Sequence, residues 1–325
     1  MKTGVIGGGA WGTALAQVLA ADGSAVVLWA RETEVVTAIN DSHENRLFLS
    51  GIPLDPAIRA TGSFADLSDC EALLLVTPAQ HLRAVLAEVQ VVARPLILCA
   101  KGIEAGTMKL MSEVAHEMCP DSPIAVLSGP TFAHEVARGL PTAITLACED
   151  PDLGRTLANR LARAHFRPYL SDDVIGAEIG GAVKNVLAIA CGVVEGRGLG
   201  QNARAALIAR GFAEMTRFGL AKGARPETLA GLSGLGDLVL TCSSMASRNF
   251  TLGKGLGEGR SAGDLLASSH TVAEGAFTAP VLQQAARALD VDMPVVDAVC
   301  TLLEGSAPVD RVVGSLLARP LRSEA

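Results

Sequence analysis

The stretch KTGVIGGGAWG, residues 2–12, decides the fold, because a short apolar run ends there in the pattern GxGxxG at Gly7, Gly9 and Gly12. Residues 13–21 continue with the composition of a helix. The first glycine permits a tight turn, the second keeps side chains away from a pyrophosphate, and the third lets the helix lie close to the sheet. The helix start adds free N–H groups and the positive end of a dipole. This order of strand, turn and helix predicts a dinucleotide site.

Other interpretations of the N-terminal stretch are a glycine-rich turn in another doubly wound protein and a site for FAD or S-adenosylmethionine. A secretory signal is a further alternative, because Lys2 precedes an apolar, alanine-rich run. The glycines interrupt that run, however, and no clean cleavage region follows it. A second apolar run, VVLW at residues 26–29, favours the dinucleotide site.

The composition indicates a globular protein with two cores. A chain of 325 residues is long enough for two domains. Apolar residues make up 49%, charged residues 19% and aromatic residues 3%, which suits helices packed on a buried parallel sheet. The net charge of −7 disfavours binding to nucleic acid or to an anionic membrane. A locally positive pocket can still bind an anionic small molecule.

The cysteines and histidines give no sign of a disulfide framework or of a metal site. The seven cysteines are scattered, odd in number and without a CxxC pair, as expected for buried thiols in a reducing cytosol. The six histidines have no metal-ligand spacing. We find no uninterrupted apolar stretch near the ~20 residues of a membrane-spanning helix. We therefore expect a soluble, cytoplasmic protein without metal.

Two regions of different character follow one another along the chain. Up to about residue 170, apolar runs alternate with helical segments, which predicts a Rossmann-type, doubly wound parallel sheet. After residue 173 one helical segment follows another, so we expect an NAD(P)-binding domain at 1–173 and an all-helical substrate domain at 174–325. The cleft between them is the expected active site. The predicted strands after the first two are residues 71–76, 96–100, 124–127, 142–147 and 166–170. A long helix is predicted at 174–194, with glycine-rich breaks near 231–236 and 253–259.

Arg31 follows the second predicted strand, where an acidic residue commonly binds the adenosine ribose. A guanidinium there can instead pair with a 2′-phosphate, which favours NADP(H) over NAD(H). A solvated arginine followed by Glu32 and Glu34 is the alternative. Use of both cofactors stays open.

Lys184 is the candidate general acid. It follows Gly180 and Gly181 on the same side of the long predicted helix. Two glycines inside a helix cost about 1 kcal/mol each relative to alanine, so we expect a close approach on that face. An ammonium above such a cleft can protonate a carbonyl oxygen during hydride transfer, and burial and nearby cations would lower its pKa. A lysine that snorkels from an ordinary packed helix is the alternative.

Two further segments carry candidate polar residues. Residues 231–237 are expected to form a flexible loop that delivers Asp237, with Thr241 one helical turn later, although such an Asp commonly caps a helix. Residues 247–249 place an arginine beside an amide, and the planar fork of arginine matches phosphate oxygens. A lone surface arginine is the alternative there.

Together these segments resemble the bacterial-type NAD(P)-dependent glycerol-3-phosphate dehydrogenases. The likeness covers nearly the whole chain and is carried by residues 7–14, 100–104, 128–133, 140–143, 180–185, 234–242, 247–249 and 272–275. It implies reversible reduction of dihydroxyacetone phosphate to sn-glycerol 3-phosphate for phospholipid synthesis, and it suggests a homodimer.

The resemblance also implies roles for individual residues. Lys184 takes the place of the proton donor and acceptor. The substrate positions are Lys101, Gly129, Thr131, Lys184, Asp237, Ser247, Arg248 and Asn249. The cofactor positions are Gly7, Gly9, Ala10, Trp11, Gly12, Arg31, Lys101, Ala133, Arg248, Val272 and Glu274. Asn185 and Thr241 also match positions that line the site. Ala10 departs from the serine that is common in the family, so a hydroxyl near the pyrophosphate is missing.

Two competing functions follow from the same residues. A related two-domain dehydrogenase for β-hydroxy acids shares the Rossmann start and a helical lysine, but it binds a carboxylate and lacks residues 247–249 in this context. A non-catalytic dinucleotide sensor is the second alternative, which an intact Lys184 and Asp237 disfavour.

Overall fold

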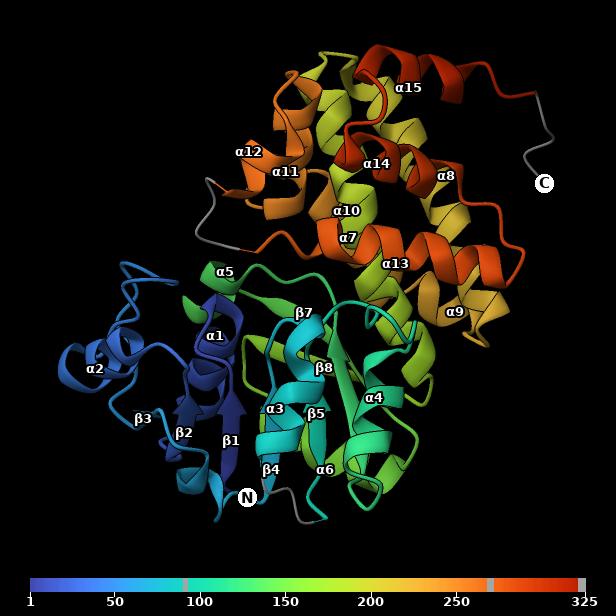
Figure 1. Ribbon diagram of the computed structural model, residues 1–325. Helices are drawn as coiled ribbons and strands as arrows, with labels where there is room; N and C mark the ends of the chain where they lie inside the picture. The colour runs from blue at the N-terminus through green and yellow to red at the C-terminus, as the bar shows by residue number, and fades with distance from the viewer. Residues whose placement is uncertain (90–92, 268–271, 321–325) are drawn as a thin grey trace.

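The protein is described by a computed structural model that covers residues 1–89, 93–267 and 272–320. Its N-terminal part is built on one eight-stranded sheet, and its C-terminal part consists of helices that lie above the sheet in the view of Figure 1. The two parts meet at the carboxyl ends of the first strands, where ligands bind in doubly wound sheets.

The sheet confirms the predicted doubly wound class, with strand order β3-β2-β1-β4-β5-β6-β7-β8. Strands β1 to β6 run parallel, whereas β7 pairs antiparallel with β6 and parallel with β8, so the last two strands depart from the predicted parallel sheet. The strands are β1 Thr3–Ile6, β2 Val26–Trp29, β3 Ile58–Thr61, β4 Ala72–Leu75, β5 Leu96–Leu98, β6 Ile124–Ser128, β7 Thr142–Cys148 and β8 Phe166–Ser171.

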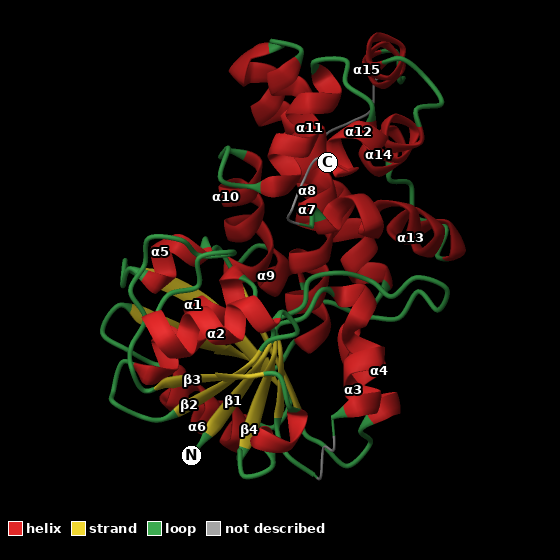
Figure 2. Ribbon diagram, turned by 60° about the vertical axis from the view of Figure 1, so that its left-hand side comes forward, coloured by secondary structure: helices red, strands yellow, loops and turns green. Residues whose placement is uncertain are grey.

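Helices cover both faces of the sheet, as Figure 2 shows for α1 and α2 on one side and α3 and α4 on the other. Val5 and Ile6 follow each other in β1 and belong to the two opposite cores, because successive side chains of a strand alternate. The bounds are α1 Ala10–Ala20, α2 Thr33–Ser42, η1 Phe64–Leu67, η2 Ala79–His81, α3 Leu82–Glu88, α4 Met111–Met118, α5 Ala133–Ala137 and α6 Pro151–Leu161.

A third core belongs to the C-terminal helices, which surround α7. This helix spans Val174–Gly196 and is buried along most of its length. By length and composition it could span a membrane, with a mean hydropathy of 1.5, but 94% of its most apolar stretch is buried inside the protein. Glu178 and Lys184 interrupt its apolar residues, in line with the expectation that no uninterrupted apolar stretch nears ~20 residues. The others are α8 Gly200–Ala221, α9 Pro226–Leu229, η3 Leu232–Gly236, α10 Asp237–Cys242, α11 Arg248–Gly257, α12 Ala262–Ala267, α13 Glu274–Ala288, α14 Pro294–Glu304 and α15 Val309–Leu317.

The two predicted glycine-rich breaks are confirmed only in part: α9 ends at Leu229 before Gly231 and α11 ends at Gly257 before Gly259, but the other glycines of these segments lie inside helices. Gly253 and Gly257 belong to α11 and face α7, where a Cβ at Gly253 would lie 1.9 Å from the carbonyl oxygen of Ile189. Residues 232–236 form a turn of π-helix that leads directly into α10. Close contact between the backbones of α11 and α7 explains Gly253 and Gly257.

Candidate functional site

The turn between β1 and α1 has the shape that a pyrophosphate requires. Gly7 has a φ of +131°, and a Cβ there would lie 2.6 Å from the carbonyl oxygen of Val76, so only glycine fits. A Cβ at Gly12 would lie 1.9 Å from the carbonyl oxygen of Gly7. The space beside Gly9 is open, since no atom lies within 4 Å of its Cβ position. Gly9 also offers no side chain to cap α1, whose first N–H groups lack helical partners.

Ala10 and Trp11 are the first residues of α1, three residues earlier than the predicted helix start. The indole Nε1 of Trp11 is buried and has no hydrogen-bond partner in the described part of the chain. An unused buried donor beside free helix N–H groups fits a bound phosphate-bearing cofactor. The missing hydroxyl at Ala10 leaves the backbone N–H as the polar group at that position.

Arg31 lies just beyond the carboxyl end of β2, on the sheet edge that carries the glycine turn. Its side chain is 75% exposed and pairs with Glu32, whose Oε1 accepts hydrogen bonds from Nε at 3.3 Å and from NH2 at 3.0 Å. This position fits an arginine that binds the 2′-phosphate of NADP(H) and also fits a solvated surface arginine.

A second cluster joins the two parts of the protein around the carboxylate of Asp237. Asp237 is fully buried, and its Oδ1 and Oδ2 accept hydrogen bonds from Lys184 Nζ at 2.6 Å and Lys101 Nζ at 2.7 Å. Lys184 also donates to Thr241 Oγ1 at 3.0 Å. Asp237 is the first residue of α10, yet its side chain binds the two lysines and does not cap the helix. Two cations around one anion leave a local net charge of about +1 in an acidic protein.

The pKa of Lys184 is lowered from 10.5 to about 8. Burial is the main cause, since the charged form loses hydration; Asp237 opposes the shift and Lys101 adds to it. This confirms the expectation that burial and a neighbouring cation would bring the lysine near the working pH. Such a group can hold a proton at neutral pH and release it readily.

The predicted close approach at Gly180 and Gly181 is confirmed. A Cβ at Gly180 would lie 2.3 Å from the carbonyl oxygen of Ser233, and one at Gly181 would lie 2.9 Å from Ser128 Oγ. The Lys101 stem also crosses Gly181, with Cγ 3.2 Å from the Cβ position. Within the described residues the hydroxyls of Ser128 and Ser233 are buried without partners. Neither serine is among the predicted site residues, although Ser128 stands beside Gly129 and Ser233 lies in the predicted loop before Asp237.

Gly129 and Thr131 follow β6 and lie against Lys101. The carbonyl oxygen of Gly129 accepts hydrogen bonds from Lys101 Nζ and from Thr131 Oγ1, both at 3.3 Å. Residues after β5 and β6 are thereby brought together with α7 and α10, as expected for ligand contacts at the carboxyl ends of strands.

Residues 247–249 form the N-cap and first two residues of α11, next to Asn185 of α7. Ser247 caps the helix by accepting a hydrogen bond from the Phe250 N–H at 3.2 Å. Asn249 donates to Asn185 Oδ1 at 3.0 Å and accepts from the Gly275 N–H at 2.9 Å, which ties three segments together.

Arg248 is exposed and, among the described residues, has no hydrogen-bond or ion-pair partner. Burial raises the pKa of the Glu274 carboxyl, while the charges of Arg248, Lys101 and Lys184 oppose that rise. These four groups therefore act on one another electrostatically. Val272 is exposed and Ala133 half-buried, and no described polar contact connects either to the lysine cluster.

Comparison with known proteins gives a consistent result. Residues 2–154 match the family described as NAD-dependent glycerol-3-phosphate dehydrogenase N-terminus, and residues 173–314 match the corresponding C-terminus. Glycerol-3-phosphate dehydrogenase (NAD(P)+) of Erythrobacter litoralis is 65% identical, with 98% of this chain and 97% of the relative covered. The Caulobacter vibrioides enzyme of the same name is 58% identical, with 100% and 99% covered. The crystal structure of glycerol-3-phosphate dehydrogenase from Coxiella burnetii superposes with a TM-score of 0.93 at 36% identity, covering 98% and 99% of the two chains.

Proposed function

The chain belongs to the NAD-dependent glycerol-3-phosphate dehydrogenase family, and on that premise we propose that it reduces dihydroxyacetone phosphate to sn-glycerol 3-phosphate, reversibly, with NADH or NADPH. The observation that carries the proposal is the buried Asp237 between Lys101 and Lys184, at the edge of a dinucleotide-binding sheet. In cells the product would supply phospholipid synthesis.

Lys184 supplies the proton in the proposed reaction. NAD(P)H, when bound, would supply the hydride that the carbonyl carbon of the substrate accepts. The Lys184 ammonium donates a hydrogen bond to the carbonyl oxygen, transfers its proton as the alkoxide forms and is left as a neutral amine. A pKa of about 8 keeps the group protonated at neutral pH while lowering the free energy needed to release the proton. In the reverse direction the neutral amine takes the proton from the hydroxyl.

The remaining charged residues hold the substrate in this proposal. Arg248 and Lys101 bind the phosphate and orient the carbonyl, while Asp237 keeps both lysines in place. The unpaired guanidinium of Arg248, beside the Asn249–Asn185 contact, suits a phosphate dianion. Gly129, Thr131 and Ser247 are proposed to complete the substrate contacts.

The cofactor occupies the N-terminal end of α1 in this proposal. Gly7, Gly9, Ala10, Trp11 and Gly12 would hold the pyrophosphate, and Arg31 would bind at the adenosine ribose. Lys101, Ala133, Arg248, Val272 and Glu274 would bind the nicotinamide end. The open space at Gly9 and the unused Trp11 indole N–H support this placement.

We assign residues 1–173 to the cofactor domain and 174–325 to the substrate domain, in a cytoplasmic homodimer. The start of α7 at Val174 supports the boundary, and seven buried, unpaired cysteines support a reducing compartment. The homodimer rests on family resemblance. Sedimentation of the purified protein would test it, because a single species of monomer mass would contradict it.

The deciding experiment follows nicotinamide absorbance while the protein is given dihydroxyacetone phosphate with NADH or NADPH. Turnover with the phosphorylated ketone supports the proposal. Preference for a carbonyl substrate that carries a carboxylate would favour the β-hydroxyacid dehydrogenase alternative. Tight NADPH binding without turnover of any substrate would leave the sensor as the better explanation.

A further inference from the structure

The loop that carries Lys101 contains an ion pair at a distance from the site. It runs from the end of β5 to the start of α4, and Glu104 stands three residues after the lysine. The Glu104 carboxylate accepts hydrogen bonds from Nε and Nη2 of Arg83, both at 2.8 Å, and from Thr107 Oγ1 at 2.6 Å. Two parallel bonds from a planar guanidinium fix the orientation of a carboxylate as well as its distance.

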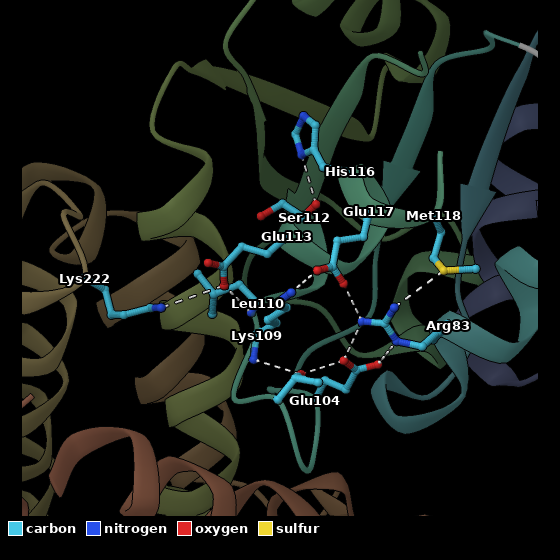
Figure 3. Close-up of polar contacts among 11 residues, drawn as sticks. Arg83, Glu104, Lys109, Leu110, Ser112, Glu113, His116, Glu117, Met118 and Lys222 are labelled. Atoms are coloured by element: carbon cyan, nitrogen blue, oxygen red, sulfur yellow. Dashed lines mark hydrogen bonds and ion pairs between the residues drawn. The ribbon is translucent and has the colours of Figure 1, made fainter. Parts of the chain in front are cut away.

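Arg83 is itself held in place by α4, as Figure 3 shows. Its Nη2 donates a hydrogen bond to the Glu117 carboxylate at 2.7 Å, and its Nη1 lies 3.5 Å from the sulfur of Met118. Lys109, near the end of the loop, also pairs with Glu117. The guanidinium therefore connects α3, the Lys101 loop and α4.

Other contacts make the loop stiff between Glu104 and Lys101. The Gln80 side chain donates to the Ile103 carbonyl oxygen at 2.8 Å and accepts from the Ala105 N–H at 2.9 Å. Gly102 lies so close to η2 that a Cβ would be 2.6 Å from the Cβ of Ala79. These contacts restrain Gly102 and Ile103, so we expect a displacement at Glu104 to reach Lys101.

Building on the function proposed above, we propose that the Arg83–Glu104 ion pair is a positioning device, which holds the loop so that Lys101 reaches Asp237 and the substrate. Lys101 meets the fully buried Asp237 at 2.7 Å, a bond that a shift of about one ångström would break. In the described chain neither Arg83 nor Glu104 has a hydrogen bond to the lysine cluster, so both act through the loop.

The test compares Glu104→Gln and Arg83→Gln with Glu117→Gln in the full-length protein. The control removes the contacts that Glu117 makes with Arg83 and with Lys109 at the far end of the loop, but it leaves the two Arg83–Glu104 bonds beside Lys101. We expect kcat/KM for dihydroxyacetone phosphate to fall about 10- to 100-fold in the first two variants and to stay within about two-fold in the control. Equal losses in all three would show that the cluster only stabilises the fold.

The pH profile separates positioning from long-range electrostatics. A displaced Lys101 no longer lowers the pKa of Lys184, so the alkaline limb of kcat/KM should move to higher pH in both Gln variants. The two variants remove charges of opposite sign, so a direct field effect would move the limb in opposite directions. That second outcome would overturn the proposal.

A third measurement does not depend on turnover. We expect an amine-directed reagent, mapped by mass spectrometry, to label Lys101 faster in Glu104→Gln and Arg83→Gln than in the wild type or in Glu117→Gln. Unchanged labelling would refute positioning even if the wild type proves inactive, whereas an inactive wild type would refute the proposed function alone. Arg83→Lys keeps the positive charge but loses the two parallel bonds to Glu104. In this variant Lys101 should be labelled at an intermediate rate, and the variant replaces the Gln variants in the test if these do not fold.

Discussion

Lys184 shares one carboxylate with Lys101, and this sharing together with burial makes its proton easy to release. A lowered pKa means that the ammonium persists below pH 8 and is lost as the pH rises through about 8. We therefore expect kcat for ketone reduction to fall above pH 8 and kcat for alcohol oxidation to rise over the same range. Steady-state rates in both directions from pH 6 to 10 would check this. Parallel profiles would point to a different group.

Replacing Lys184 by alanine should reduce turnover by about 10²- to 10⁴-fold, the usual contribution of a general acid. NADPH binding, measured by fluorescence titration, should change little, because the site at the start of α1 is built from other residues. Lys254→Ala is the matched control, since that lysine is solvent-accessible on α11 and pairs with Glu258. If Lys184→Ala retains kcat within a few fold, the proton comes from elsewhere.

Arg248→Ala should impair recognition of the phosphate more than chemistry at the carbonyl. Leaving a bound dianion without its partner costs roughly 2–5 kcal/mol in ground and transition states, so KM should rise steeply and kcat should fall less. Unphosphorylated dihydroxyacetone offers nothing for Arg248 to hold, and its kcat/KM should hardly respond. If kcat/KM fell by the same factor on both substrates at fixed ionic strength, residues 247–249 would not be the phosphate site.

Arg31→Asp should shift cofactor preference from NADPH toward NADH, because a carboxylate repels a 2′-phosphate and accepts ribose hydroxyls. The substitution also breaks the pair with Glu32 and leaves two acidic side chains there. The ratio of kcat/KM for the two cofactors is the measurement, and Arg155→Asp on α6 is the control. An unchanged ratio would identify Arg31 as a surface residue.

At the scale of elements, the backbones of α7 and α11 are in contact at glycines, so replacing one of these glycines by alanine tests the contact directly. Gly253→Ala would place a Cβ 1.9 Å from the Ile189 carbonyl oxygen, and overpacking of this kind destabilises by about 1–3 kcal/mol or more. Gly314→Ala in α15 is the control, because no atom lies within 4 Å of its Cβ position and alanine favours helix by up to about 1 kcal/mol. Denaturant unfolding should show opposite shifts in midpoint. Similar shifts would mean that α11 moves freely away from α7.

The same glycines show why some elements could be predicted from the sequence and others could not. The apolar strands and the long helix at 174–194 were predicted because burial leaves a periodic pattern in the chain. Residues 253–257 look like a break locally, yet they form the end of α11, in which Gly253 and Gly257 pack against α7. β3 was missed because its four residues include the exposed Arg59 and lie at the sheet edge. The direction of β7 was also missed, since side-chain pattern is the same for parallel and antiparallel strands.

At the scale of the whole molecule, the site is assembled from segments that are remote in sequence. Lys101 and Asp237 are separated by 136 residues, and no local pattern could indicate that two lysines share this carboxylate. The resemblance to the family predicts which residues belong to the site, whereas only the structure shows the hydrogen bonds among them. The loop after Lys101 also inserts Ile103 and Leu110 into the core of the helical part, so the two parts are joined at the site itself.

The helix α7 contributes to the cores of both parts, and this governs how the chain folds. Val174 and Ala177, in its first turn, belong to a core of the sheet, while Ile179 and later residues belong to the core of the helical part. Glu178 lies between these stretches and accepts hydrogen bonds from the N–H and hydroxyl of Ser112 in α4. Neither part can unfold without exposing one end of this helix to solvent. We therefore expect a single cooperative unfolding transition, whereas two independent domains would show two transitions.

The two tryptophans make that cooperativity measurable, because Trp11 and Trp29 both lie in the sheet part, whereas far-ultraviolet circular dichroism is dominated by the helical part. The denaturation curves from the two signals should coincide. A tryptophan signal that is lost first would show that the sheet melts while the helices persist. Coincident curves would mean that the chain is stabilised or destabilised as one cooperative unit, in which a substitution on either side of Val174 lowers the melting temperature of both.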